Sequence, residues 1–149
     1  MTKFLLAVHV IAVIVAIGPV TVAASMFPPA ARRALAAPDD ARAAETVRLL
    51  HRICRVYAVV GVVVPVFGLA TAGQMGVLGD AWLIVSIVLT GLAAGVLAGL
   101  VLPRQGVWVE GGGTREDAAR LAMFSGVFNL LWVVVTVLMI VRPGSTTGA

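Results

Sequence analysis

Four long apolar runs dominate this chain, and each is long enough to cross a membrane as a helix. They cover residues 4–24, 56–72, 81–102 and 121–141. A spanning helix needs about 20 mostly apolar residues, with a range of about 17–25. Backbone groups left unpaired in lipid carry a large energetic cost, so the runs are expected to be helical. We therefore predict an all-α, polytopic membrane protein whose helices form a four-helix antiparallel transmembrane bundle.

The composition supports a membrane environment. Hydrophobic residues make up 60% of the chain and charged residues 12%, whereas a soluble domain carries about 25% charged residues. Sixteen of the 18 charged residues are clustered between the apolar runs, so the net charge of +4 describes the loops and chain ends and not one basic face. We expect the lipid bilayer as the surroundings and no nucleic-acid partner.

The loops contain signals for where the helices begin. Pro38-Asp39-Asp40 is typical of a helix start, and it predicts one unbroken second helix in which Pro65 introduces a kink. Thr114 and Asp117 resemble a capping box at the start of the fourth helix. The chain is thus predicted to be a single transmembrane domain over residues 1–149. Its expected parts are helices at 4–24, 40–72, 81–102 and 114–141, a short interfacial helix at 29–37, loops at 25–55 and 103–120, and a disordered tail at 144–149.

Basic residues are distributed unequally between the two sides of the predicted bundle. Nine of the eleven lie in loops 25–55 and 103–120, and only Lys3 and Arg142 lie on the other side. The positive-inside rule places the basic loops in the cytoplasm. We therefore predict a multi-pass protein of the cell (plasma) membrane with both termini outside and the larger loops cytoplasmic.

Small residues form stripes along the predicted helices. Gly91, Gly95 and Gly99 give a doubled GxxxG pattern, and such patterns allow transmembrane helices to approach closely. These stripes are expected either to hold the four helices together or to bind another subunit. The predicted packing or partner residues are Gly61, Gly68, Gly91, Gly95, Gly99 and Asn129.

His9 is an ionisable residue within the first apolar run, and such residues are candidate functional sites. Ser86 and Thr136 are expected at a similar depth, where their hydroxyls could bond to the imidazole. The alternatives are a packing histidine and a ligand for haem, a metal or a proton. A bis-histidine haem with His51 is not expected, because the two histidines lie near opposite membrane faces.

His51 and Cys54 share a helix face at a spacing of i,i+3, which suits two ligands of one metal ion. Two ligands do not complete a site, so no metal is predicted there. Arg48, Arg52 and Arg55 form a basic stripe on the same segment. This stripe is expected to bind lipid headgroups or an acidic partner, or to fix the helix at the interface.

The sequence offers little support for catalysis. No carboxylate lies inside an apolar run, and the familiar hydrolase, metalloprotease and phosphate-binding motifs are absent. No cofactor is predicted, with haem or a metal at His9 kept as alternatives. The leading hypothesis is a small non-enzymatic accessory subunit that packs against other membrane subunits, or against copies of itself. The alternatives are a small-molecule, cofactor or metal carrier that uses His9, and a small oligomeric transporter.

The first helix carries a resemblance to a known group of proteins. Residues 4–10 with His9, the Gly18-Pro19 pair and the Phe27-Pro28-Pro29 exit resemble bacterial, actinobacterial-type integral membrane proteins of unknown function. The resemblance implies four helices and an early histidine in helix one. A more remote similarity is to copper-resistance D-like membrane proteins. This chain lacks their further membrane histidines and any methionine cluster, so copper handling is not carried over.

Overall fold

The computed structural model describes residues 2–144, and all regular secondary structure within that range is helical. Four helical segments are long and apolar enough to cross a membrane. They are Thr2–Ala36, Ala41–Met75, Ala81–Val109 and Arg115–Val141. The predicted all-α four-helix bundle and its multi-pass membrane character are thereby confirmed. The tail predicted to be disordered lies outside the described residues from position 145 onward.

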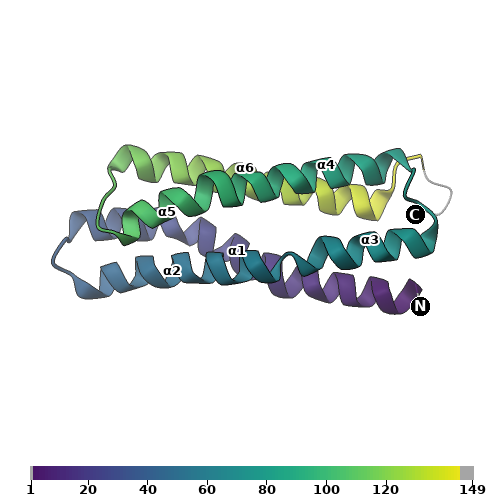
Figure 1. Ribbon diagram of the computed structural model, residues 1–149. Coiled ribbons are helices and arrows are strands. Elements are labelled where there is room, and N and C mark those ends of the chain that lie inside the picture. The colour runs from purple at the N-terminus through teal and green to yellow at the C-terminus, as the bar shows by residue number, and fades with distance from the viewer. Residues whose placement is uncertain (1, 145–149) are drawn as a thin grey trace.

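The spans run antiparallel and side by side (Figure 1). The elements are α1 (Thr2–Ala36), α2 (Ala41–Val60), α3 (Val63–Met75), α4 (Ala81–Val96), the π-helical turn η1 (Leu97–Val101), α5 (Leu102–Val109) and α6 (Arg115–Val141). Helix α1 packs against α2, α3 and α6, while α4 packs mainly against α6. In the described structure α1 and α4 make few contacts, so they occupy diagonal positions in the bundle.

One end of the bundle contains the turns from α1 to α2 and from α5 to α6, as Figure 1 shows. Nine of the eleven lysines and arginines lie in the segments around these turns, and we call this end the basic end. The opposite end holds the beginning of α1, the turn from α3 to α4 and the end of α6.

Helix α1 is longer than predicted. It continues without interruption to Ala36, through Pro19, Pro28 and Pro29, where a helix ending at residue 24 and a separate one at 29–37 were expected. A proline removes a backbone hydrogen bond and crowds the preceding turn. Here the helix is supported on two sides, because residues of this stretch belong to one buried cluster with residues of α2 and α6. Its buried residues in the stretch are Ala23, Ala24, Phe27, Pro28, Ala30 and Ala31.

The second span is divided, where an unbroken helix was predicted. Helix α2 ends at Val60 and α3 begins at Val63. Pro65 has no backbone N–H to donate to Gly61 four residues earlier, and its ring crowds that carbonyl. The Gly61 carbonyl instead accepts a bond from the Val64 N–H at 3.1 Å. The tighter bonding interrupts the α-helical hydrogen-bond ladder over one turn, while Gly61 and Val62 keep right-handed helical backbone angles.

The third span extends beyond the predicted end at residue 102. It passes through η1 and continues as α5 to Val109, so residues 103–109 are helical where a loop was expected. Pro103 lies in the first turn of α5, directly after the π-helical turn. A π-helical turn adds a residue to the helix and changes which carbonyls are paired. This adjustment lets the chain accommodate Pro103 without leaving the helical path.

Helix α6 begins with the predicted capping box. The Thr114 hydroxyl accepts a bond from the Asp117 N–H at 3.2 Å, and the Asp117 carboxylate accepts one from the Thr114 N–H at 2.9 Å. Reciprocal bonds of this kind satisfy backbone donors that a helix start leaves unpaired. Arg120 pairs with Glu116 at 2.7 Å on the exposed surface, one turn along the helix.

Candidate functional site

His9 is buried between α1 and α3. Its Nδ1 donates a hydrogen bond to the Val64 carbonyl oxygen at 2.9 Å. A Cβ atom placed on Gly68 would lie only 2.8 Å from Cε1 of the imidazole. The ring therefore occupies space that is open because residue 68 has no side chain. The arrangement positions α1 on α3, and it leaves Nε2 as the nitrogen of a neutral ring that can still accept a bond.

The structure does not bring Ser86 or Thr136 to His9. Ser86 is buried and donates to the Trp82 carbonyl at 2.7 Å, one turn back in its own helix. Thr136 is exposed and donates to the Trp132 carbonyl at 2.8 Å. Local bonds of this type are common for hydroxyls in helices. The three residues were expected together only because they lie at a similar depth in the membrane. Ser86 is on α4, which lies diagonally across the bundle from α1, and Thr136 is on an exposed part of α6.

His51 and Cys54 converge on Gln105, a residue that sequence reasoning missed. His51 Nδ1 donates to Gln105 Oε1 at 3.0 Å, and Gln105 Nε2 approaches Cys54 Sγ at 3.6 Å. Gln105 and Cys54 are both fully buried. Gln105 was missed because residues 103–120 were predicted to form a loop, and a loop residue is not expected inside the bundle. The spacing of buried Val101, Gln105 and Trp108 at steps of four and three is the signal that would have placed Gln105 on an inward helix face.

Replacing Gln105 by leucine is expected to lower the free energy of unfolding in detergent by about 1–3 kcal/mol, because His51 then loses its partner inside the bundle. Thermal melting followed by circular dichroism measures the change. Gln74 is exposed near the end of α3, and Gln74→Leu serves as the matched control with an expected effect within about 0.5 kcal/mol. Equal melting temperatures for the two variants would contradict a structural role for the Gln105 network.

The glycine stripes predicted for packing have different positions. Gly68 faces His9, and Gly61 forms the break between α2 and α3. Gly91, Gly95 and Gly99 are exposed, and a Cβ atom on any of them would have no described neighbour within 4 Å. The GxxxG pattern of the third span therefore faces away from the other three spans.

Asn129 joins α6 to α1. Its Nδ2 donates to Ser25 Oγ at 2.9 Å, and Ser125 one turn earlier donates to the Ala24 carbonyl at 3.2 Å. The Asn129 Oδ1 atom is buried and has no hydrogen-bond partner among the described residues. Polar contacts of this kind can hold transmembrane helices together, because lipid offers no substitute partner.

The basic stripe of α2 lies on the surface. Arg48, Arg52 and Arg55 are exposed, and none forms a salt bridge with another residue of the described range. They are free to meet lipid headgroups or an acidic partner. Within residues 2–144 no three His, Cys, Asp or Glu side chains gather closely enough to hold a metal ion.

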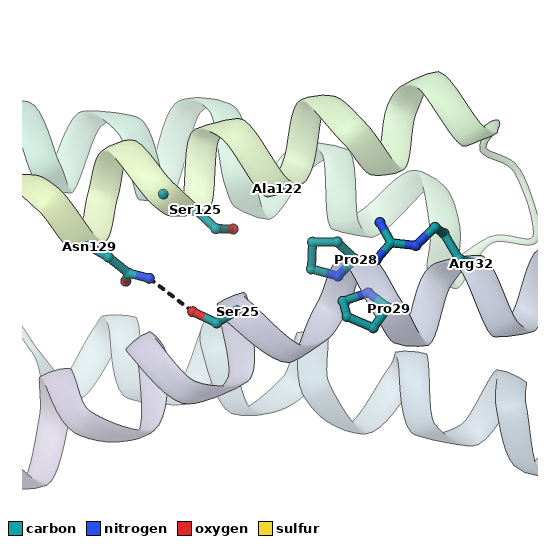
Figure 2. A pocket seen from close by; sticks show the side chains of 8 residues that line it. Ser25, Pro28, Pro29, Arg32, Ala122, Ser125 and Asn129 are labelled. Atoms are coloured by element: carbon teal, nitrogen blue, oxygen red, sulfur yellow. Dashed lines mark hydrogen bonds between the residues drawn. The ribbon is translucent and has the colours of Figure 1, made fainter.

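The hollows between the helices include a groove of about 250 Å³ between α1 and α6 near the basic end. Figure 2 shows the Asn129–Ser25 contact at one end of this groove and Arg32 at the other, with Pro28 and Pro29 between them. Another hollow, of about 150 Å³, lies at the break between α2 and α3, and its lining residues come from all four spans and include Pro65, Thr90 and Trp132. His9 lines neither hollow.

The fold and these sites define a multi-pass membrane protein built as a four-helix bundle. No protein-family model, no curated protein and no solved structure matches this chain. The resemblance of the first helix to actinobacterial-type membrane proteins therefore stays a prediction, as do the carrier and transporter hypotheses.

Proposed function

We propose that this protein is a non-enzymatic accessory subunit that docks against a helix of another membrane protein through one face of α4. Gly91 and Gly95 lie in α4 and Gly99 lies in the adjoining turn η1; we call the surface that these three residues form the α4 glycine face. Three exposed glycines on a helix that must lie in lipid carry the proposal. Glycine in a helix costs about 1 kcal/mol relative to alanine, and an inward contact within this chain does not explain the cost.

The neighbours of the glycine face favour a helix as the occupant. Ile84, Val88 and Leu92 are exposed next to it, with 49%, 57% and 54% of their surfaces accessible. Large apolar side chains beside a flat glycine strip give the ridge and groove that a second helix can fill. The seven acidic residues all lie outside the apolar runs, which supports a role without acid–base chemistry in the membrane.

Gly95→Leu is expected to abolish association, because the new side chain would separate the two helix backbones at the centre of the face. The measurement is purification of the tagged protein from native membranes in a mild detergent, followed by mass spectrometry of stoichiometric partners. Gly73→Leu is the matched control, since Gly73 is also exposed with no described neighbour within 4 Å.

The proposal requires a stoichiometric partner protein that is retained by the control and lost from the Gly95 variant. A wild-type protein that purifies alone as a monomer would contradict the proposal. A complex made only of identical copies would replace the accessory role with self-association through the same face. Retention of the partner by the Gly95 variant would show that docking uses another surface.

A further inference from the structure

The groove between α1 and α6 combines a cationic end with an uncharged polar end. Arg32 lines one end, and it forms no salt bridge with any residue in the described part of the chain. Asn129 and Ser25 line the other end, where Asn129 Oδ1 lacks a hydrogen-bond partner within residues 2–144. No residue that lines this groove belongs to the α4 glycine face, so the two surfaces can be tested separately.

The walls of the groove are kept open by small or compact residues. Pro28 and Pro29 form the α1 wall, as Figure 2 shows, and Ala122 and Gly126 contribute from α6. A Cβ atom on Gly126 would have no described neighbour within 4 Å. No large side chain therefore projects from α6 into the groove over this helix turn, and the groove remains accessible from the side of the bundle.

The groove lies where the first apolar run ends and the basic end of the bundle begins. Ser25 directly follows the first apolar run, and Arg32 lies seven residues further toward the basic end, about 10 Å along the helix. The headgroup layer adds about 5–8 Å to each side of a hydrocarbon core of about 30 Å. The flexible Arg32 side chain can reach back toward this layer. Ala122 and Asn129 lie within the fourth apolar run, so the groove spans the boundary of the hydrocarbon core, with its Arg32 end on the headgroup side.

We propose that this groove is a binding site for an anionic phospholipid. The phosphate would pair with the guanidinium of Arg32, which supplies charged donors suited to phosphate oxygens. The glycerol region would lie beside Ser25 and Asn129, where the exposed Ser25 hydroxyl, which accepts a bond from Asn129 Nδ2, can donate its own proton to a lipid oxygen. The acyl chains would continue along the apolar surfaces of α1 and α6. Charge complementarity at Arg32 favours an anionic lipid over a partner helix.

The test measures lipid binding to the purified, delipidated protein by native mass spectrometry in a nonionic detergent. Phosphatidylglycerol and phosphatidylcholine are the two probes, and inorganic phosphate is added as a competitor. The wild-type protein is expected to retain phosphatidylglycerol in preference to phosphatidylcholine. An excess of inorganic phosphate should not displace it, because the lipid also occupies the apolar part of the groove.

Two variants separate the groove from general surface charge. Arg32→Gln is expected to weaken phosphatidylglycerol binding by about fivefold, the size of one basic residue near an anionic headgroup. Gly126→Leu is expected to weaken it as well without changing any charge, because the side chain would fill the groove. Arg33→Gln is the matched control, since Arg33 is exposed and does not line the groove. Circular dichroism establishes that each variant remains folded.

A loss of lipid in the Arg32 and Gly126 variants, but not in the Arg33 control, would support the site. Equal losses in the Arg32 and Arg33 variants would overturn it in favour of diffuse surface charge. Equal binding of the two lipids by the wild-type protein would also overturn it. Loss of a co-purifying protein from the Gly126 variant, with lipid unchanged, would assign the groove to a partner helix instead.

Discussion

Gly68→Ala is expected to destabilise the bundle by about 1–3 kcal/mol, the usual range for an added methyl group in a well-packed position. The new Cβ would lie 2.8 Å from Cε1 of His9. The imidazole would have to move, and its 2.9 Å bond to the Val64 carbonyl would be stretched or lost. Thermal or denaturant unfolding in detergent, followed by circular dichroism, measures the effect.

The same substitution at Gly73 provides the control. Gly73 lies in α3, is exposed, and a Cβ added to it would have no described neighbour within 4 Å. Alanine favours a helix over glycine by about 1 kcal/mol, so Gly73→Ala should be neutral or slightly stabilising. Only the alanine at position 68 is thus expected to destabilise the bundle, although the two positions lie five residues apart on one helix.

A double-mutant cycle isolates the contact with His9. His9→Ala removes the ring, so Gly68→Ala should cost much less in that background than in the wild-type protein. Additive effects of the two substitutions would show that His9 does not fill the space above Gly68. In that case the α1–α3 contact would depend on other residues, and His9 would again be open to a ligand role.

The spans were predictable because lipid restricts the chain to few solutions. A long apolar run must pair its own backbone groups, so hydropathy alone identifies the four spans. Their local ends are less determined. The Thr114–Asp117 cap was visible because its bonds are formed by residues three positions apart. The sequence did not predict that the third span continues as a helix to Val109, because this continuation depends on how the π-helical turn accommodates Pro103.

The prolines of this chain affect their helices differently. Pro28 and Pro29 leave α1 continuous, whereas Pro65 divides the second span at Gly61. Sequence alone gives each proline the same missing donor and the same steric conflict. The neighbours differ, since the proline segment of α1 belongs to a buried cluster shared with α2 and α6, and this packing favours a continuous helix. Gly61 also tolerates the tight turn that precedes Pro65.

The candidate sites were harder to predict, because they depend on which helices are neighbours. Gly68 and Gly95 both belong to small-residue stripes, and nothing in the spacing indicates that one faces His9 while the other faces outward. Likewise, the equal depth of His9 and Ser86 was insufficient, because α1 and α4 are diagonal. The role of Gln105 as a buried partner of His51 could not be predicted, because it requires that residues 102–109 form a helix packed beside α2.

The turn between α5 and α6 gives the second large expected effect. Gly113 has a φ angle of +104°, and a Cβ at this position would lie 2.5 Å from Cε2 of the Trp108 indole. Trp108 belongs to the main buried cluster, which also contains Val101, Ala118 and Leu121. The glycine therefore has two separate functions in the fold: it adopts a backbone conformation that other residues resist, and it lets the chain pass across the face of the indole.

Gly113→Ala is expected to cost about 1–2 kcal/mol for the left-handed backbone and about 1–3 kcal/mol more for displacing Trp108. Gly111→Ala is the control that separates these contributions. Gly111 has a φ angle of +90°, but no described neighbour lies within 4 Å of an added Cβ. It should show only the backbone cost. Unfolding in detergent measures the stability, and tryptophan fluorescence reports the environment of the indoles.

The comparison decides what this turn contributes to the bundle. If Gly113→Ala is clearly more destabilising than Gly111→Ala and also changes the fluorescence, Trp108 anchors the α5–α6 turn to the core. Equal losses with unchanged fluorescence would mean that only backbone conformation matters there. Because the turn directly precedes the Thr114 cap, displacement of Trp108 should also loosen the first turn of α6. Faster amide hydrogen exchange at residues 115–118 in the Gly113 variant alone would demonstrate that coupling.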